Sequence, residues 1–101
     1  MSLLDKDAEK RVVSFLRKIH LALILERYDE RIRRVLDLIE KMPEMEKQII
    51  TRKYIQTEAE YTRHQEIYQS MGISDGLYRK IRLRGLRKIY DDLKLRGISL
   101  D

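Results

Sequence analysis

Two rows of apolar residues, spaced by three or four positions, dominate the first 42 residues of the chain. The first row contains Val12, Leu16, Ile19 and Leu23, and the second contains Tyr28, Ile32, Val35, Ile39 and Met42. This spacing is typical of amphipathic helices, because residues three or four apart lie on the same helix face. The step from Leu23 to Tyr28 is five residues, so we expect two helices with a break between Glu26 and Asp29. One long helix with a shifted stripe is the alternative.

Helix-start signals recur in the middle of the chain. Pro43 precedes Glu44 and Glu46, and this order favours the first turn of a helix. Proline is tolerated there because the N–H groups of the first turn have no partner within the helix, and carboxylates are stabilised by the positive end of the helix dipole. Thr62 and Gln65 have the spacing of a capping box before the helix "RHQEIYQSM". The residues expected to face inward are Met45, Ile49, Ile50 and Tyr54 in the first helix and Ile67 and Met71 in the second.

A glycine-containing corner is expected to join the last two helices. Gly72 suits the left-handed position that closes a helix, and Ile73 provides an apolar plug. Ser74 has the side chain of a helix cap, and Asp75 would lie on the first turn of the next helix. The pattern therefore predicts a helix, a tight corner and a second helix.

The last helix is expected to run from Asp75 to about Leu95 and to end before Gly97. At about 100° per residue, its core side contains Tyr78, Ile81, Gly85, Leu86, Ile89 and Leu93. The opposite side contains Gly76, Arg79, Lys80, Leu83, Arg84 and Arg87. Arg82 and Lys88 lie at the flanks of this outer side.

Few residues in the chain break helices. It contains one proline and four glycines among 101 residues, of which 43% are hydrophobic and 39% charged. Long helices joined by short corners fit this composition better than a sheet with many turns. A chain of this length forms one domain. We therefore expect a small, compact all-α unit, with amphipathic helices for packing or dimerisation in residues 1–42 and the helix, corner and helix in residues 43–101.

The positive charge is concentrated in the last expected helix. Lysine and arginine number 22 and aspartate and glutamate 17, so the formal net charge is +5 at pH 7. The segment 79–88 holds six basic residues and no acidic one, and the rest of the chain has 16 basic and 17 acidic residues. A concentrated cationic stripe is typical of a surface that binds a polyanion. A solvated helix face is the simpler alternative.

Several kinds of site find no support in the sequence. There is no cysteine, and His20 and His64 have no ligand spacing around them, so we expect neither a metal nor a cofactor. No catalytic constellation or glycine-rich phosphate loop is present, so we do not expect an enzyme. The longest apolar run, "LALIL", is far shorter than a membrane span of roughly 20 residues, and "DKDAE" argues against a secretory signal. We expect a soluble cytoplasmic protein without a membrane partner.

The expected helix, corner and basic helix are the parts of a helix-turn-helix, whose second helix enters the DNA major groove. Arginine can bind guanine O6 and N7 with two hydrogen bonds, and lysine adds a mobile charge. The candidate DNA-binding residues are Ser74, Asp75, Gly76, Arg79, Lys80, Leu83, Arg84 and Arg87, and the phosphate-contact candidates are Arg63, Arg82 and Lys88. Leu83 is unusual on a solvated face, and contact with a thymine methyl group would explain it.

Three segments of the second half resemble the fourth conserved region of bacterial sigma factors. They read "MPEMEKQIITRKY", "EIYQSMGIS" and "DGLYRKIRLRGLRKI". With the Arg/Lys-rich amino-terminal helices, the chain is also similar to ArpU/RinA-type phage and prophage transcriptional regulators, small activators of late or lysis genes with a sigma-region-4-like helix-turn-helix. The resemblance covers about residues 42–93. It implies a regulator that binds double-stranded DNA sequence-specifically in a bacterial host cell, with RNA polymerase as a further partner.

The resemblance also implies roles for single residues. Ser74 matches the cap of the recognition helix, and Arg79 and Lys80 match the pair that reads the promoter element. The core positions of the sigma pattern fall on Ile81, Leu86 and Ile89. Asp75 and Gly76 depart from the pattern, because sigma factors usually carry basic and acidic reading residues there. This departure implies a different DNA target.

Two other functions compete with DNA binding. A protein-interaction module would hold RNA polymerase or a sigma factor through Leu16, Ile19 and Leu23 and would use the basic helix on an acidic protein surface. An RNA-binding protein with an arginine-rich helix would prefer structured RNA to duplex DNA. The row from Tyr28 to Met42 fits either a homodimer seam or a core within one chain.

Overall fold

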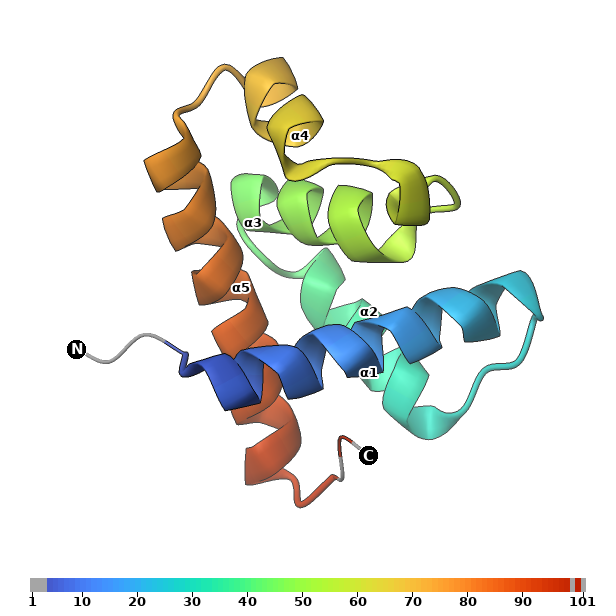
Figure 1. Ribbon diagram of the computed structural model, residues 1–101. Coiled ribbons are helices and arrows are strands. Elements are labelled where there is room, and N and C mark those ends of the chain that lie inside the picture. The colour runs from blue at the N-terminus through green and yellow to red at the C-terminus, as the bar shows by residue number, and fades with distance from the viewer. Residues whose placement is uncertain (1–3, 99, 101) are drawn as a thin grey trace.

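The computed structural model describes residues 4–98 and residue 100, and these residues form helices and no strand. The elements are α1 (Lys6–Ile24), α2 (Glu30–Glu40), α3 (Glu44–Ile50), η1 (Thr51–Ile55), η2 (Ala59–Tyr61), α4 (His64–Met71) and α5 (Asp75–Leu95). The π-helical η1 continues α3, and η2 is a short 3-10 turn. In Figure 1, α1 crosses α5, α2 lies behind α1, α3 lies above α1, and α4 stands above α3. The all-α prediction is confirmed.

The amino-terminal region forms two helices, as the five-residue step predicted. Asp5 caps α1 by accepting a hydrogen bond from the Ala8 amide at 2.8 Å, and Asp29 caps α2 by accepting one from the Ile32 amide at 2.9 Å. Glu26 lies between them with a left-handed φ of 56°. The chain therefore reverses at residues 25–29, where Asp29 supplies the start signal for α2.

The buried face of α3 differs from the prediction at one position. The helix begins after Pro43, as expected, and Ile49, Ile50 and Tyr54 are buried. Met45 is 38% exposed, whereas Glu46 is only 3% exposed. The prediction that Met45 faces inward was therefore wrong. The face of α3 that packs against α5 carries Glu46 and Ile50.

The Thr62 capping box was also wrong. The cap position of α4 is Arg63, whose side chain makes no capping hydrogen bond. The Thr62 hydroxyl instead donates to the Glu58 carbonyl at 2.8 Å, which ties it back to the preceding turn. Ser and Thr hydroxyls often bond to nearby carbonyls in this way, and that local bond competes with capping.

The corner between α4 and α5 agrees with the prediction. Gly72 adopts a left-handed φ of 69° and closes α4. Ser74 caps α5 by accepting a hydrogen bond from the Leu77 amide at 3.1 Å. Ile73 is partly buried beside a small core cluster of Ile49, Ile67, Tyr78 and Ile81. Residues 72–74 thus end α4 and begin α5 as their local chemistry predicts.

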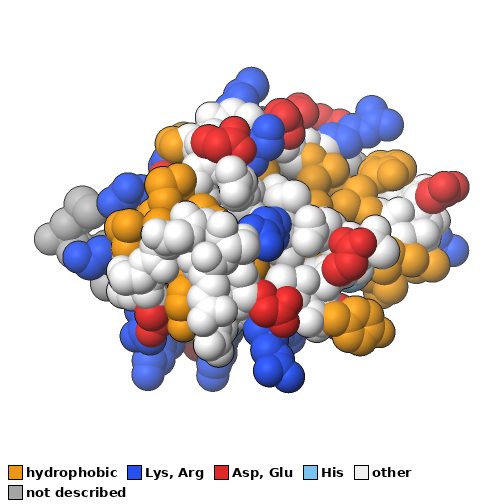
Figure 2. Space-filling view, turned by 90° about the horizontal axis from the view of Figure 1, so that it is seen from above, with side chains coloured by type: hydrophobic (Ala, Val, Ile, Leu, Met, Phe, Trp, Pro, Cys, Tyr) orange, Lys and Arg blue, Asp and Glu red, His pale blue; other side chains and the backbone are white. Residues whose placement is uncertain are grey.

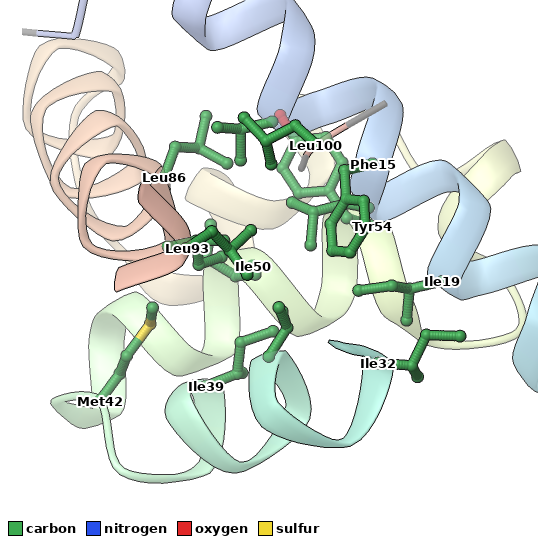
Figure 3. Close-up of a cluster of buried hydrophobic side chains, with 14 residues drawn as sticks. Phe15, Ile19, Ile32, Ile39, Met42, Ile50, Tyr54, Leu86, Leu93 and Leu100 are labelled. Atoms are coloured by element: carbon green, nitrogen blue, oxygen red, sulfur yellow. The ribbon is translucent and has the colours of Figure 1, made fainter. Parts of the chain in front are cut away.

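A larger core cluster joins both halves of the chain. Figure 3 shows its side chains converging from α1, α2, α3, η1 and α5. The buried members are Val12, Phe15, Leu16, Ile19, Ile32, Val35, Ile39, Met42, Ile50, Tyr54, Leu86, Ile89, Leu93 and Leu100. The row from Ile32 to Met42 is therefore part of the intramolecular core, while Tyr28 stays 51% exposed. This row offers no seam for a homodimer.

Candidate nucleic-acid interface

The outer face of α5 presents cations that the fold does not use. Gly76, Arg79, Lys80 and Arg84 are exposed, as are Ser74 and Asp75 at the start of the helix. Within the part of the chain that the structure describes, Arg79, Lys80 and Arg84 make no hydrogen bond or ion pair. The six residues predicted for the core side of α5, from Tyr78 to Leu93, are all buried. The helix is thus anchored on one side and cationic on the other.

Arg87 extends this outer face towards the middle of α5. It is partly exposed, and its Nε donates to Asp91 Oδ2 at 3.4 Å, one turn further along. Exposed pairs of this spacing are weak, so the guanidinium can be drawn to a stronger anion. From Gly76 to Arg87 the face spans about 16 Å along the helix axis.

Leu83 has an intramolecular explanation. Its side chain is partly buried and packs against the larger core cluster. It also lines a hollow of about 530 Å³ beside Leu4 and Lys6 at the start of α1. The outward orientation expected for Leu83 is therefore wrong, and its apolar character needs no thymine methyl to account for it.

Arg82 is a structural residue, which corrects its prediction as a phosphate contact. Its side chain is only 13% exposed, and Nη2 donates to Glu9 Oε2 at 2.9 Å. Nε donates to Tyr54 Oη at 2.7 Å. These bonds join α5 to α1 and η1 in a partly buried setting. The guanidinium is held by Tyr54 and Glu9 and is not available to a phosphate group.

Lys88 is likewise engaged inside the molecule. Its Nζ lies 2.6 Å from Glu46 Oε1, and the Glu46 side chain is 4% exposed. A carboxylate this deeply buried needs a compensating cation, because removal from water disfavours its charge. Lys88 therefore stabilises Glu46 at the α3–α5 contact, and although its side chain is 40% exposed, transfer to a phosphate group would leave the buried carboxylate without its cation. Of the three phosphate-contact candidates, Arg63 alone is exposed as predicted.

A histidine and a tyrosine meet beside this interface. His64 Nδ1 lies 2.6 Å from Tyr78 Oη, and the two rings pack edge to face with centroids 5.5 Å apart. Burial of the ring, followed by the positive charges of Arg82 and Lys53, lowers the pKa of His64 to about 4. Burial also raises the pKa of Tyr78 to about 12. At neutral pH the imidazole is therefore uncharged, and the Tyr78 hydroxyl keeps its proton and is hydrogen-bonded to His64 Nδ1.

No feature of the sequence pairs these two residues. His64 and Tyr78 are 14 residues apart and lie on different helices. The same holds for the partners of Arg82, which are 28 and 73 residues away. Such pairs form only once α1, α4 and α5 are packed.

Other kinds of site and the comparisons with known proteins add no assignment. Along residues 4–98 and at residue 100, no three His, Asp or Glu side chains are placed to hold a metal ion. No helix in that same part of the chain is long and apolar enough to cross a membrane.

No protein-family model, curated protein or solved structure matches the chain.

Proposed function

We propose that the chain binds double-stranded DNA sequence-specifically, with α4, the corner of residues 72–74 and α5 acting as a helix-turn-helix. The observation that carries this proposal is the row of exposed Arg79, Lys80 and Arg84, which have no hydrogen bond or ion pair among the residues that the structure describes, while the other side of the same helix is buried. Unpaired cations on a rigid, anchored helix suit a polyanion whose groove admits a helix.

The start of α5 suits close contact with DNA. Gly76 has no Cβ, and no other atom lies within 4 Å of where one would be. A base edge or phosphate can therefore approach the backbone closely there. The Ser74 hydroxyl oxygen accepts the Leu77 amide, so its proton is left to donate to a phosphate oxygen. Arg79 and Lys80, on the next turn, are the residues we assign to base contacts.

The resemblance to sigma-factor region 4 and to ArpU/RinA-type regulators supports a role in transcription. A phage or prophage late- or lysis-gene activator acting at a promoter is the version of this proposal that the resemblance favours. Asp75 and Gly76 replace the reading residues usual in sigma factors, so we expect a different operator. RNA polymerase is the further partner that this version implies.

The test begins with selection of bound sites from a random pool of duplex DNA. On the recovered site, Arg79→Ala and Lys80→Ala should each weaken binding by about 1–3 kcal/mol and relax the choice of base at one position. Arg33→Ala, which removes an exposed arginine on α2, is the matched control and should have little effect. If both α5 variants fold and bind every duplex as the parent does, the recognition-helix assignment is wrong.

A salt titration separates phosphate contacts from structural cations. The logarithm of affinity should fall steeply with the logarithm of salt concentration, by about 0.9 for each phosphate contacted. Arg63→Ala and Arg87→Ala should each reduce this slope and weaken all duplexes evenly. Replacement of Arg82 or Lys88 should instead lower the unfolding midpoint. A flat salt dependence would contradict DNA binding.

The two competing functions fare differently. Leu16 and Ile19 are fully buried, so a protein-interaction module built on them is not supported. RNA binding by an arginine-rich helix would depend on the same exposed cations of α5 as the proposed DNA binding. Direct competition between a structured RNA and the selected duplex distinguishes them, and preference for the RNA would favour that alternative.

A further inference from the structure

The carboxyl-terminal end of α1 and the loop after it expose an apolar stripe. Leu21, Ile24, Leu25 and Tyr28 are 56%, 55%, 53% and 51% exposed. Leu21, Ile24 and Leu25 have the spacing of one helix face at the last turn of α1, and Tyr28 follows in the loop that leads to α2. Figure 2 shows hydrophobic side chains gathered on the right, the side on which α1 ends in Figure 1. Contiguous exposed apolar surface of this kind marks an interaction site.

This stripe borders a half-open hollow of about 590 Å³ between α1, η1, η2 and the start of α4. Leu21 and Ile24 form one side of the hollow, and Val13, Tyr54 and Ala59 contribute further apolar surface. Tyr54 and Ala59 are buried, so this part of the hollow is held rigidly by the core. The hollow is large enough to accept one or two apolar side chains from outside.

The same hollow carries an excess of positive charge. Arg17, Lys53 and Arg82 line it, against the single carboxylate of Glu60 among its described lining residues. Arg82 is already paired with Glu9, but Arg17 is exposed and has no hydrogen bond or ion pair among the described residues. The Lys53 ammonium donates to the Thr62 carbonyl at 2.8 Å. Burial, then the charges of Arg17 and Arg82, lower the pKa of Lys53.

We propose that this hollow and the adjoining apolar stripe bind an acidic amphipathic segment of a partner protein. An apolar side chain of that segment enters between Leu21 and Tyr54, and a neighbouring carboxylate meets Arg17 and Lys53. The inference does not depend on DNA binding. In Figure 1, α5 begins on the left and α1 ends on the right, so a partner on the stripe leaves the outer face of α5 free.

Charge and shape favour this occupant over two others. In a symmetric dimer through this surface, Arg17 and Lys53 of each copy would approach the same cations of the other, which is repulsive. An anionic membrane would satisfy the charge, but a flat bilayer surface does not fill a concave hollow. An acidic peptide segment satisfies the charge and the shape together.

The test is selection of 16-residue peptides from a random library on the immobilised full chain, followed by fluorescence anisotropy with the recovered peptides. We expect them to carry Asp or Glu beside Leu, Ile or Phe at helical spacing. Arg17→Glu and Ile24→Ser should each weaken binding about tenfold or more. The matched controls Arg33→Glu on α2 and Leu95→Ser, at an 87% exposed position of α5, should leave affinity unchanged.

Several outcomes would overturn the proposal. These are an empty selection, recovered peptides without acidic residues, and peptide binding that Arg17→Glu and Ile24→Ser leave intact in folded protein. Sedimentation that shows a dimer dissolved by Ile24→Ser would assign the stripe to a second copy. Flotation with phosphatidylglycerol vesicles that is lost in Ile24→Ser would assign it to a membrane. Duplex binding by Ile24→Ser should match that of the parent, which keeps this test separate from the DNA proposal.

Discussion

Two largely buried charged residues, Arg82 and Glu46, determine which cations of the segment 79–88 are used in packing. Both are largely buried, and each is tolerated because a residue of opposite charge from another helix lies against it. Removal of one member of such a pair leaves a desolvated charge, and that is more costly than the pair itself is stabilising. The run from 79 to 88 therefore contains cations with two different physical roles.

The Arg82 cluster predicts a stability effect far from the proposed DNA face. Glu9→Gln keeps the size of the side chain but removes the charge that meets the guanidinium, and we expect it to lower the free energy of unfolding by roughly 1–3 kcal/mol. Urea unfolding followed by circular dichroism measures this. Glu60→Gln is the control, since Glu60 is an exposed glutamate. An unchanged midpoint for Glu9→Gln would show that the pair does not contribute to stability.

At the scale of elements, the close contact of α3 with α5 depends on Gly85. A Cβ placed there would lie 3.1 Å from Ile50 Cγ1 and 3.3 Å from Ile50 Cδ1, and Ile50 is fully buried. Glycine weakens a helix interior, but here the missing side chain allows the two helices to approach. The position of α5, and with it the outer cationic face, follows from this contact.

Two glycine substitutions on α5 should therefore have opposite signs. Gly85→Ala should destabilise by about 1 kcal/mol or more, because the Ile50 side chain has little room to move and crowding outweighs the gain in helix propensity. Gly76→Ala meets no neighbour within 4 Å and should stabilise by up to about 1 kcal/mol. Thermal unfolding of both variants checks this. If Gly85→Ala is more stable than the parent, α3 and α5 can move apart without loss of stability. If the double variant Gly85→Ala with Ile50→Val recovers stability, crowding against Ile50 is confirmed.

At the scale of the whole molecule, charge is partitioned among three surfaces. Arg79, Lys80 and Arg84 on the outer face of α5 have no ion pair among the described residues. Glu9 and Glu46 neutralise the cations between α1, α3 and α5, and the cations around the α1 hollow outnumber the carboxylates that line it. Packing of α1 and α4 against α5 creates this division. It also places His64 near Arg82 and Lys53, where a further positive charge is disfavoured.

This placement predicts a pH dependence of global stability. The folded-state pKa of His64 is lowered to about 4, whereas an unfolded histidine titrates near 6.5. Between these values the unfolded chain binds the proton and the folded chain does not, so stability should fall as pH is lowered from about 6.5 towards 4. Urea midpoints across this range should show a shallower fall in His64→Gln. Equal slopes in the parent and the variant would exclude His64 as a source of the effect.

The local features were predictable because they depend on residues a few positions apart. The break before Asp29, the left-handed Gly72, the Ser74 cap and the buried face of α5 all follow from spacing and from hydrogen bonds within about one turn. Errors arose where a neighbour in space decided the outcome. Met45 is exposed and Glu46 is buried because α5 covers the face of α3 that carries Glu46. Leu83 is partly buried because it packs against the larger core cluster.

The sequence by itself determined that the chain is helical, where the last helix begins and ends, and that positive charge gathers on that helix. Periodicity, capping and composition carry that information because they act through neighbours along the chain. Only the tertiary structure decided which cations are free, that Arg82 and Lys88 are held by Glu9 and Glu46, and that the end of α1 borders a cationic hollow. These depend on contacts between distant segments, up to 73 residues apart for Arg82 and Glu9, and desolvation on packing decides which charges must be paired.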